Sequence, residues 1–219
     1  MTQIATKDRI LDAAETLFAR DGYVATSLRA ITVEAEANVA AIHYHFGSKQ
    51  SLLEALFKRR VAAINDERIG RLDAAEKGGA GTPSLDEVLR IFLEPALRRL
   101  GSDDTGWTRF TRVMGRVLGE TGDHVHAIQQ VFSEVRMRFV PALKRALPHL
   151  SPEDIAWRMH FLIGTMSFLL ADPARLSIMT NGRCDASDSE QALAQMLAFV
   201  HGGFASPAAK PLSHAKDGA

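Results

Sequence analysis

The stretch Asn38-Val-Ala-Ala-Ile-His-Tyr-His-Phe-Gly-Ser-Lys49, preceded by the short block Ser27-Leu-Arg-Ala-Ile31, decides the fold of this chain. Val39, Ile42 and Phe46 recur at intervals of three and four, which predicts a helix with one buried stripe. Its other face carries two alanines, which permit close approach to a groove floor, and imidazole and phenol groups, which can hydrogen-bond to bases or phosphates. The pattern predicts a helix-turn-helix whose second helix enters the major groove of DNA.

Helices are also predicted on both sides of this pair. One spans about Lys7 to Arg20 and ends at Asp21-Gly22, a helix stop signal. Another begins after the capping residue Ser48 and connects to the rest of the chain, ending at Lys77. Together these helices predict a small N-terminal domain over residues 1–60.

Beyond the glycine-rich break Lys77-Gly-Gly-Ala-Gly-Thr-Pro83, the apolar residues keep a spacing of three to four, without strand-like alternation. The helices predicted from this spacing cover residues 84–100, 107–118, 123–147, 151–170 and 186–200. We therefore expect an all-α protein. A three-helix helix-turn-helix domain at 1–60 is followed by a larger helical domain at 61–204 and a flexible tail at 205–219.

The charge of the chain is balanced, with 26 Lys and Arg against 26 Asp and Glu, and residues 1–60 are barely positive. Charge alone does not point to nucleic acid, because phosphate neutralisation normally supplies much of the affinity for DNA. Arg29 and Lys49 flank the predicted recognition helix. DNA binding is therefore expected to depend on a few well-placed contacts, from these two residues with His43 and Tyr44.

The single cysteine, Cys184, excludes an internal disulfide framework and a cysteine-based zinc cluster. The sequence offers neither a long apolar run typical of a membrane span nor a basic and apolar N-terminal signal. These observations predict a cytoplasmic protein with no membrane partner.

The segment from about residue 7 to about residue 60 resembles the N-terminal domain of the TetR family of bacterial transcriptional regulators. The residues that carry the resemblance are Tyr44-His45-Phe46-Gly47-Ser48-Lys49 with Leu52, and upstream Arg9-Ile-Leu-Asp-Ala-Ala14, Leu17-Phe18, Gly22-Tyr23 and Thr26-Ser27. The resemblance implies a homodimer that binds a palindromic double-stranded DNA operator. It also implies a ligand-responsive repressor, with a C-terminal domain for ligand binding and dimerisation.

The resemblance implies a set of DNA-contacting residues, namely Thr26, Ser27, Arg29, Asn38, Ala40, Ala41, His43, Tyr44, His45 and Lys49. Of these, Thr26, Ser27, Tyr44 and Lys49 would contact phosphates, and Arg29, Ala40, Ala41 and His43 would face base edges. Asn38 would cap the recognition helix. His45 would support that helix or touch a backbone phosphate.

The turn between the two helices departs from the family pattern, which commonly has glycine where this chain has Glu36. A left-handed backbone at Glu36 would cost about 1 kcal/mol. Either the turn is strained, or the helix before it continues slightly further.

Bulky apolar residues of the C-terminal domain are candidates for a ligand cavity, namely Phe92, Phe110, Met114, Phe132, Phe139 and Phe161, with Arg112, Arg116, Arg136 or His160 to hold a carboxylate or ester. Pro95 and Pro141 would bow helices apart. The segments Trp107–Glu120 and Trp157–Gly164 resemble, more loosely, the branch of the family that responds to fatty acids or acyl-CoA. The alternatives are an ordinary core for the apolar residues and solvated faces for the arginines.

The last two predicted helices carry more apolar surface than a two-helix edge needs. We expect them to pair with a second copy in a four-helix interface formed by Ile155, Met159, Leu162, Ile163, Met166, Leu193, Met196, Leu197 and Val200.

Other functions fit the sequence less well. It contains no nucleophile-elbow, phosphate-loop or zinc-protease motif, so no enzyme activity and no cofactor are expected. His124 and His126 would diverge on a helix, which disfavours a metal site. The remaining alternative is a helical adaptor without sequence-specific DNA binding.

Overall fold

The computed structural model describes residues 3–78 and 82–209. Within these ranges every regular element is a helix, which confirms the predicted all-α fold. The helices are α1 (Gln3–Asp21), α2 (Leu28–Glu34), α3 (Val39–Phe46), α4 (Lys49–Lys77), α5 (Leu85–Leu97), α6 (Thr105–Leu118), α7 (Asp123–Val131), α8 (Ser133–Ala146), α9 (Pro152–Ala171), α10 (Ala174–Met179) and α11 (Ser189–Ala205). None of them combines the length and apolarity of a membrane span.

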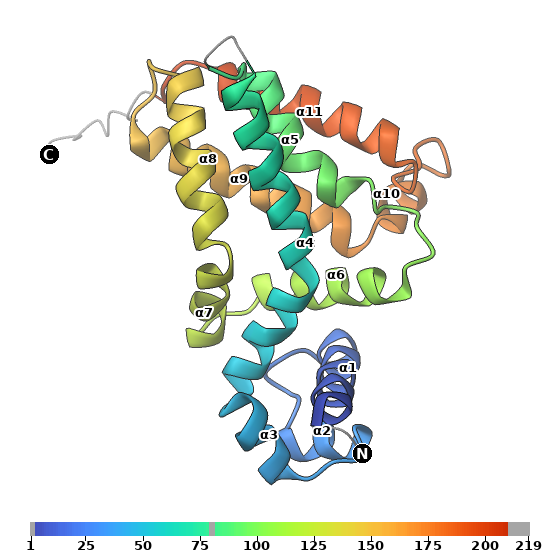
Figure 1. The fold of residues 1–219 in the computed structure, drawn as a ribbon. Coiled ribbons are helices and arrows are strands. Elements are labelled where there is room, and N and C mark those ends of the chain that lie inside the picture. The colour runs from blue at the N-terminus through green and yellow to red at the C-terminus, as the bar shows by residue number, and fades with distance from the viewer. Residues whose placement is uncertain (1–2, 79–81, 210–219) are drawn as a thin grey trace, which may run out of the picture.

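The helices α1, α2 and α3 form a small head with the first turns of α4 (Figure 1). Its core contains Phe18, Ile31 and Ile42, each 0% exposed. The predicted buried stripe of α3 is wrong in part, since Val39 is 40% exposed and Phe46 is only half-buried. Val39 opens this short helix, where the head no longer covers it, so Ile42 alone anchors α3 deeply.

Helix α4 joins the head to the rest of the molecule as one continuous element of 29 residues (Figure 1). Its first turns are buried in the head through Leu52, Leu53 and Leu56, and the helix also contacts α5, α7 and α8 of the body. It ends at Lys77, as predicted. The predicted domain boundary at residue 60 therefore falls inside an unbroken helix.

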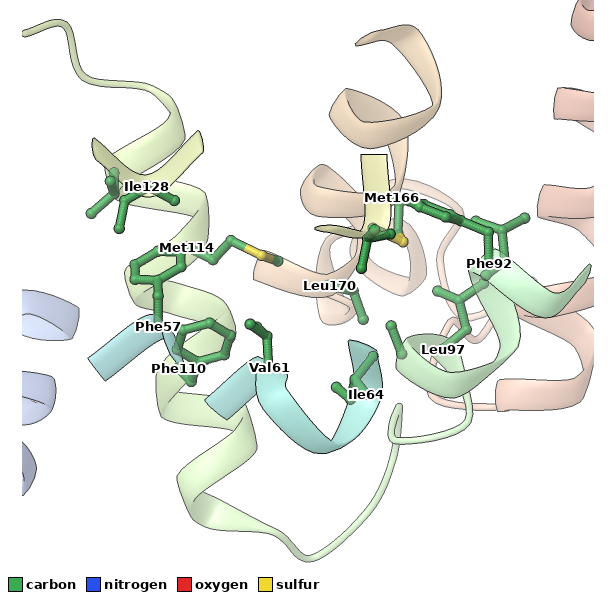
Figure 2. Close-up of a cluster of buried hydrophobic side chains, with 14 of the residues drawn as sticks. Phe57, Val61, Ile64, Phe92, Leu97, Phe110, Met114, Ile128, Met166 and Leu170 are labelled. Carbon is green, nitrogen blue, oxygen red and sulfur yellow. The ribbon is translucent and has the colours of Figure 1, made fainter. Parts of the chain in front are cut away.

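Helices α5 to α11 form the larger body, in which α5, α7 and α8 contact α4 (Figure 1). Figure 2 shows its apolar interior, in which Phe57 of α4 meets Phe110 of α6 with ring centroids 5.0 Å apart. Phe92 of α5 lies near Met166 of α9 in the same view. The cluster runs from the end of the head to the core of the body, so the two parts share one continuous hydrophobic core.

Helix α4 also places a cation inside this core. Arg68 is 3% exposed, and its Nε donates a hydrogen bond to the Phe92 carbonyl at 2.7 Å. Its guanidinium lies over the Phe92 ring at 4.3 Å. Burial lowers the pKa of Arg68 to about 10. The contact fixes α5 against α4.

Three details of the predicted body helices are wrong. Residues 123–147 form two helices, because the backbone of Phe132 leaves the helical conformation (φ −102°, ψ 6°). The short helix α10 lies between the predicted helices 151–170 and 186–200, where no helix was predicted. Helix α11 begins at Ser189 and continues to Ala205, so it enters the predicted tail. Most of that tail, residues 210–219, lies outside the described residues.

Candidate nucleic-acid interface and body cavity

The two helices of the candidate DNA-binding unit begin at side-chain caps. Ser27 precedes α2, and its Oγ accepts a hydrogen bond from the Ala30 N–H at 3.0 Å. Asn38 precedes α3, and its Oδ1 accepts from the Ala41 N–H at 2.8 Å. These bonds satisfy N–H groups that the first helical turn leaves unpaired, so both helices have fixed starting points.

The turn between α2 and α3 is strained at Glu36, whose φ is +48°. Of the two alternatives that the sequence left open, the strained turn is therefore confirmed. Arg9 of α1 supports it, since its Nε donates to the Ala35 carbonyl at 3.1 Å. A basic side chain at the end of α2 also suits the negative pole of the helix dipole.

Most of the predicted DNA-contacting residues lie on the accessible surface of the head. The exposed ones are Ser27, Arg29, Asn38, Ala40, His43 and Tyr44, and the half-buried ones are Ala41, His45 and Lys49. They occupy α2, α3 and the start of α4, at the end of the molecule opposite α11 (Figure 1). This surface is called the head face below.

Thr26 is the exception. It is 4% exposed, and its hydroxyl donates to the Gly22 carbonyl at 2.7 Å. A phosphate contact through this side chain is excluded by its burial. Thr26 instead closes the loop that leads into α2, and Ser27 is the exposed hydroxyl of the pair.

Lys49 holds the same loop from the other side. Its ammonium donates to the carbonyls of Tyr23 and Val24 and lies 4.2 Å from the centre of the Tyr23 ring. Partial burial lowers the pKa of Lys49. The structure therefore gives Lys49 a positioning role, while its predicted phosphate contact stays a prediction.

His43 is fixed in its tautomer by a contact at the end of α3. Its Nδ1 lies 2.9 Å from the Gly47 carbonyl oxygen, an acceptor only, so Nδ1 carries the hydrogen. In the neutral ring, Nε2 is then an acceptor. The side chain is exposed on the head face, where such an acceptor suits the amino groups of adenine or cytosine.

A polar contact between head and body was missed by the sequence reasoning. Glu120, just after α6, accepts the Tyr23 N–H at 3.1 Å and lies 2.8 Å from Nε2 of His124. The His124 ring stacks on Tyr23 with centroids 4.2 Å apart. Desolvation, followed by the Glu120 charge, raises the pKa of Tyr23. The spacing of four between Glu120 and His124 was the available signal.

The apolar residues proposed to line a ligand cavity do not gather around one space. Phe92, Phe110, Met114 and Phe139 are buried in the core, where Phe92 and Phe139 meet edge to face at 5.2 Å. Phe161 is 59% exposed on the outside of α9. The others also lie elsewhere, with Phe132 at the break between α7 and α8 and His160 exposed on α9. For the buried four, the alternative of an ordinary core fits the structure.

A cavity of about 980 Å³ lies elsewhere, between α6, α9, α10 and the end of α1. Two of the predicted ligand-binding residues, Arg112 and Arg116 of α6, line it. Arg136 does not line it, and belongs to α8. The cavity borders the head as well as the body, since Ala19 and Arg20 of α1 form part of its wall.

The residues predicted for a dimer interface are mostly turned inward. Within this one chain Ile155, Met159, Leu162, Met166, Met196, Leu197 and Val200 are already buried, and Leu193 is half-buried. Only Ile163 is exposed, at 39%. The longest apolar stripe of each helix therefore packs against its own body, and an interface formed by these residues stays a prediction. The exposed sides instead carry Trp157, Phe161 and Phe168 on α9 and Phe199 on α11, each at least 59% exposed.

Two family models match this chain. The model described as "Bacterial regulatory proteins, tetR family" covers residues 10–56, and the one described as "Tetracyclin repressor-like, C-terminal domain" covers residues 90–203. The first match coincides with the head and the second with most of the body.

Curated relatives match over short lengths. The probable HTH-type transcriptional regulator YttP of Bacillus subtilis is 43% identical over 54 residues, which cover 25% of this chain and 26% of that protein. The HTH-type transcriptional repressor NicS of Pseudomonas putida is 35% identical over 72 residues, which cover 32% of this chain and 34% of that protein. The chain thus spans about a quarter to a third of these relatives.

Solved structures match over nearly the whole chain at low identity. NalD of Pseudomonas aeruginosa, the secondary repressor of the MexAB-OprM multidrug efflux pump, gives a TM-score of 0.64 at 19% identity, covering 92% of this chain and 98% of that one. FadR of Bacillus subtilis in complex with stearoyl-CoA gives a TM-score of 0.63 at 15% identity. The match covers 90% of this chain and 98% of that one. These likenesses concern the fold.

Proposed function

The chain belongs to the TetR family of bacterial transcriptional regulators, and on that premise we propose that it is a repressor that binds a palindromic DNA operator as a homodimer. Its effector, proposed to be a fatty acid or acyl-CoA, favours a conformation in which the two recognition helices no longer fit the operator. Such an effector must bind the released conformation about 5 kcal/mol more tightly to shift the equilibrium decisively.

The head face is the observation that carries this proposal. Helix α3 exposes Ala40, His43 and Tyr44, and α2 exposes Arg29 beside it. The helix is anchored by Ile42 and capped by Asn38, so the exposed side chains are presented from a rigid support. A short, rigid helix with small and hydrogen-bonding side chains suits the major groove.

The homodimer is supported by the exposed aromatic side of α9 and α11. Trp157, Phe161 and Phe199 are each at least 59% exposed, and large contiguous apolar patches on a folded chain mark interaction surfaces. Pairing of these two helices with their copies buries that surface in a four-helix interface. Two-fold symmetry then sets the two α3 helices about 34–36 Å apart, one turn of DNA.

The fatty acyl effector is supported by two observations. The Bacillus subtilis FadR structure, which shares the fold, contains stearoyl-CoA. In this chain, a large cavity carries two arginines that can bind an acidic group.

The test is a mobility-shift titration with DNA from the region upstream of the chain's own gene, at several salt concentrations. A specific, salt-sensitive complex is expected. Arg29→Ala combined with His43→Ala is expected to abolish it, because both side chains belong to the head face. Lys58→Ala, the same charge change at an exposed position of α4, is the control and retains the complex. Equal affinity for scrambled DNA would reject the repressor and favour the adaptor alternative.

A further inference from the structure

The cavity between α6, α9, α10 and the end of α1 is strongly basic. Its wall contains one acidic residue, Asp172, and the arginines Arg20, Arg99, Arg112, Arg116 and Arg175. Three of these arginines have a neighbouring carboxylate: Arg20 pairs with Asp21 at 2.8 Å, Arg99 with Asp104 at 3.5 Å and Arg175 with Asp172 at 3.4 Å. Within the described ranges, the remaining two arginines have no carboxylate within ion-pair distance, although Asp21 interacts with the charge of Arg116 at longer range.

Those two, Arg112 and Arg116, stand four residues apart on α6, so they are neighbours on one face of the helix. Among the residues that the structure describes, neither forms an ion pair or a side-chain hydrogen bond. Like charges at this spacing repel each other. An anion bound between them would remove the repulsion and satisfy several N–H donors at once.

The opposite wall carries a second, independent sign of a ligand. Ser167 of α9 is 5% exposed and lines the cavity, and its Oγ has no hydrogen-bond partner. A serine inside a helix commonly donates to a carbonyl of the preceding turn, as Thr165 does to Phe161 at 2.9 Å. A buried hydroxyl without a hydrogen-bond partner is energetically unfavourable, so the Ser167 hydroxyl is available to donate a hydrogen bond to a ligand.

Apolar side chains complete the wall. Trp107 of α6 and Phe168 of α9 both line the cavity, the first 5% and the second 61% exposed. The volume of about 980 Å³ lies at the upper end of the range for small-molecule sites, about 300–1,000 Å³. The space therefore admits an organic body as well as an acidic group.

We propose that this cavity binds a small organic oxyanion, a carboxylate or a phosphate monoester attached to an apolar chain. The guanidinium groups of Arg112 and Arg116 bind the oxygens, and the Ser167 hydroxyl donates a further hydrogen bond to them. The apolar chain lies against Trp107 and Phe168. This proposal rests on the proposed function, because it places the acidic, apolar effector at named residues of the cavity.

The regulatory consequence follows from the position of the cavity. Ala19 and Arg20, at the end of α1, belong to the head and line the cavity together with α6 and α9. A ligand there contacts both parts of the molecule. It therefore stabilises one arrangement of the head against the body, which is the differential interaction that an effector requires.

Calorimetric titration of the full chain tests the site, with decanoate, decyl phosphate, decan-1-ol and inorganic phosphate as probes. We expect at least one decyl anion to bind about tenfold or more tightly than the alcohol, because only an anion engages the two guanidiniums. Which of the two anions binds identifies the oxyanion. Decan-1-ol binding as tightly as both anions, or inorganic phosphate as tightly as decyl phosphate, would overturn the proposal.

Variants locate the binding. Arg112→Ala with Arg116→Ala should weaken the preferred anion about tenfold or more, whereas Arg109→Ala, on the same helix but outside the cavity wall, should leave it unchanged. Ser167→Ala should weaken binding without lowering the melting temperature, because it removes a hydroxyl that has no partner in the fold. Unchanged affinity in both the double variant and Ser167→Ala would reject the site.

A parallel mobility-shift measurement separates the two proposals. Loss of anion binding in the presence of a specific DNA complex would refute the cavity site alone. Anion binding with no specific DNA complex would refute the repressor and leave the site in place.

Discussion

Glu36 holds a backbone conformation that glycine adopts at little cost, with φ at +48° between α2 and α3. Glu36→Gly is expected to stabilise the protein by about 1 kcal/mol, raising the melting temperature by about 2–4 °C, because it removes the contact between Cβ and the carbonyl oxygen. Urea denaturation with calorimetry measures the change.

Glu36→Ala is the matched control, because it removes the same charge and retains Cβ. Glu36→Gly should therefore be more stable than Glu36→Ala by most of the increase in unfolding free energy expected for the glycine variant. If both raise the melting temperature equally, the effect comes from charge, and backbone strain at Glu36 is not its cause.

His43 should act in sequence recognition. With Nδ1 donating to Gly47, its Nε2 presents an acceptor on the head face. His43→Ala is expected to weaken operator binding at pH 8 by about 1–3 kcal/mol, the range of a good base contact. The slope of log affinity against log salt should stay unchanged, because a neutral imidazole neutralises no phosphate. A smaller slope in the variant would instead place His43 on the backbone.

For single residues, the sequence predicted which side chains of α3 are exposed better than it predicted the side-chain contacts of the loop before α2. Spacing identifies which side of a helix is polar, and His43 and Tyr44 are exposed accordingly. Spacing does not reveal that the hydroxyl of Thr26 turns back to Gly22, or that Lys49 reaches Tyr23 across 26 residues. Those contacts depend on how the loop after α1 returns to α4.

Helix α3 has eight residues and depends on its cap. Asn38→Ala is expected to cost about 1 kcal/mol of unfolding free energy, because the Ala41 N–H loses its acceptor. DNA affinity should fall as well, since the first turn of the recognition helix frays. Denaturation curves and mobility shifts measure the two effects.

Asn38→Asp separates the cap from the DNA contact. An aspartate caps as well as asparagine, so stability should be kept, while its charge should repel phosphate and weaken binding. Tight DNA binding by this variant would show that the position does not approach the DNA.

Helix existence was more predictable than helix ends. The periodicity located the long elements, but the break at Phe132 has no glycine or proline to announce it. The six residues of α10 are too few for a periodic pattern, and their limits are marked by Pro173 before them and by Asn181 and Gly182, both with positive φ, after them. The apolar stripe of α9 that was predicted to meet a second copy is buried in this chain, because sequence patterns do not distinguish a stripe facing the core from one facing a partner.

In the whole molecule, Glu120 connects the body to the head through Tyr23 and His124. Glu120→Ala is expected to leave both parts folded and to reduce the effect of a bound ligand on DNA affinity, because this contact transmits their relative position. Mobility shifts measure the ratio of the DNA affinities without and with whichever decyl anion binds the cavity. Asp66→Ala, exposed on α4, is the control and should retain the full ratio.

The assembly of two copies should depend on the exposed aromatic side of α9. Phe161→Glu is expected to give monomers, because a charge would be buried in the four-helix interface. Met137→Glu, at a comparably exposed position on α8, should stay dimeric. Sedimentation analysis decides, and a dimeric Phe161→Glu would place the interface on another surface.

Because α4 is one continuous helix, a small tilt at its body end produces a larger displacement of the head. A helix of 29 residues is about 44 Å long, at about 1.5 Å per residue. Since Leu52, Leu53 and Leu56 are fully buried in the head, the head turns with the helix. A tilt of about 5° at the body end therefore carries the head through about 4 Å, slightly more than the rise of one base pair along the DNA axis, about 3.4 Å. A rearrangement too small to disturb the packing of the body can thus shift α3 by about one base pair relative to the DNA.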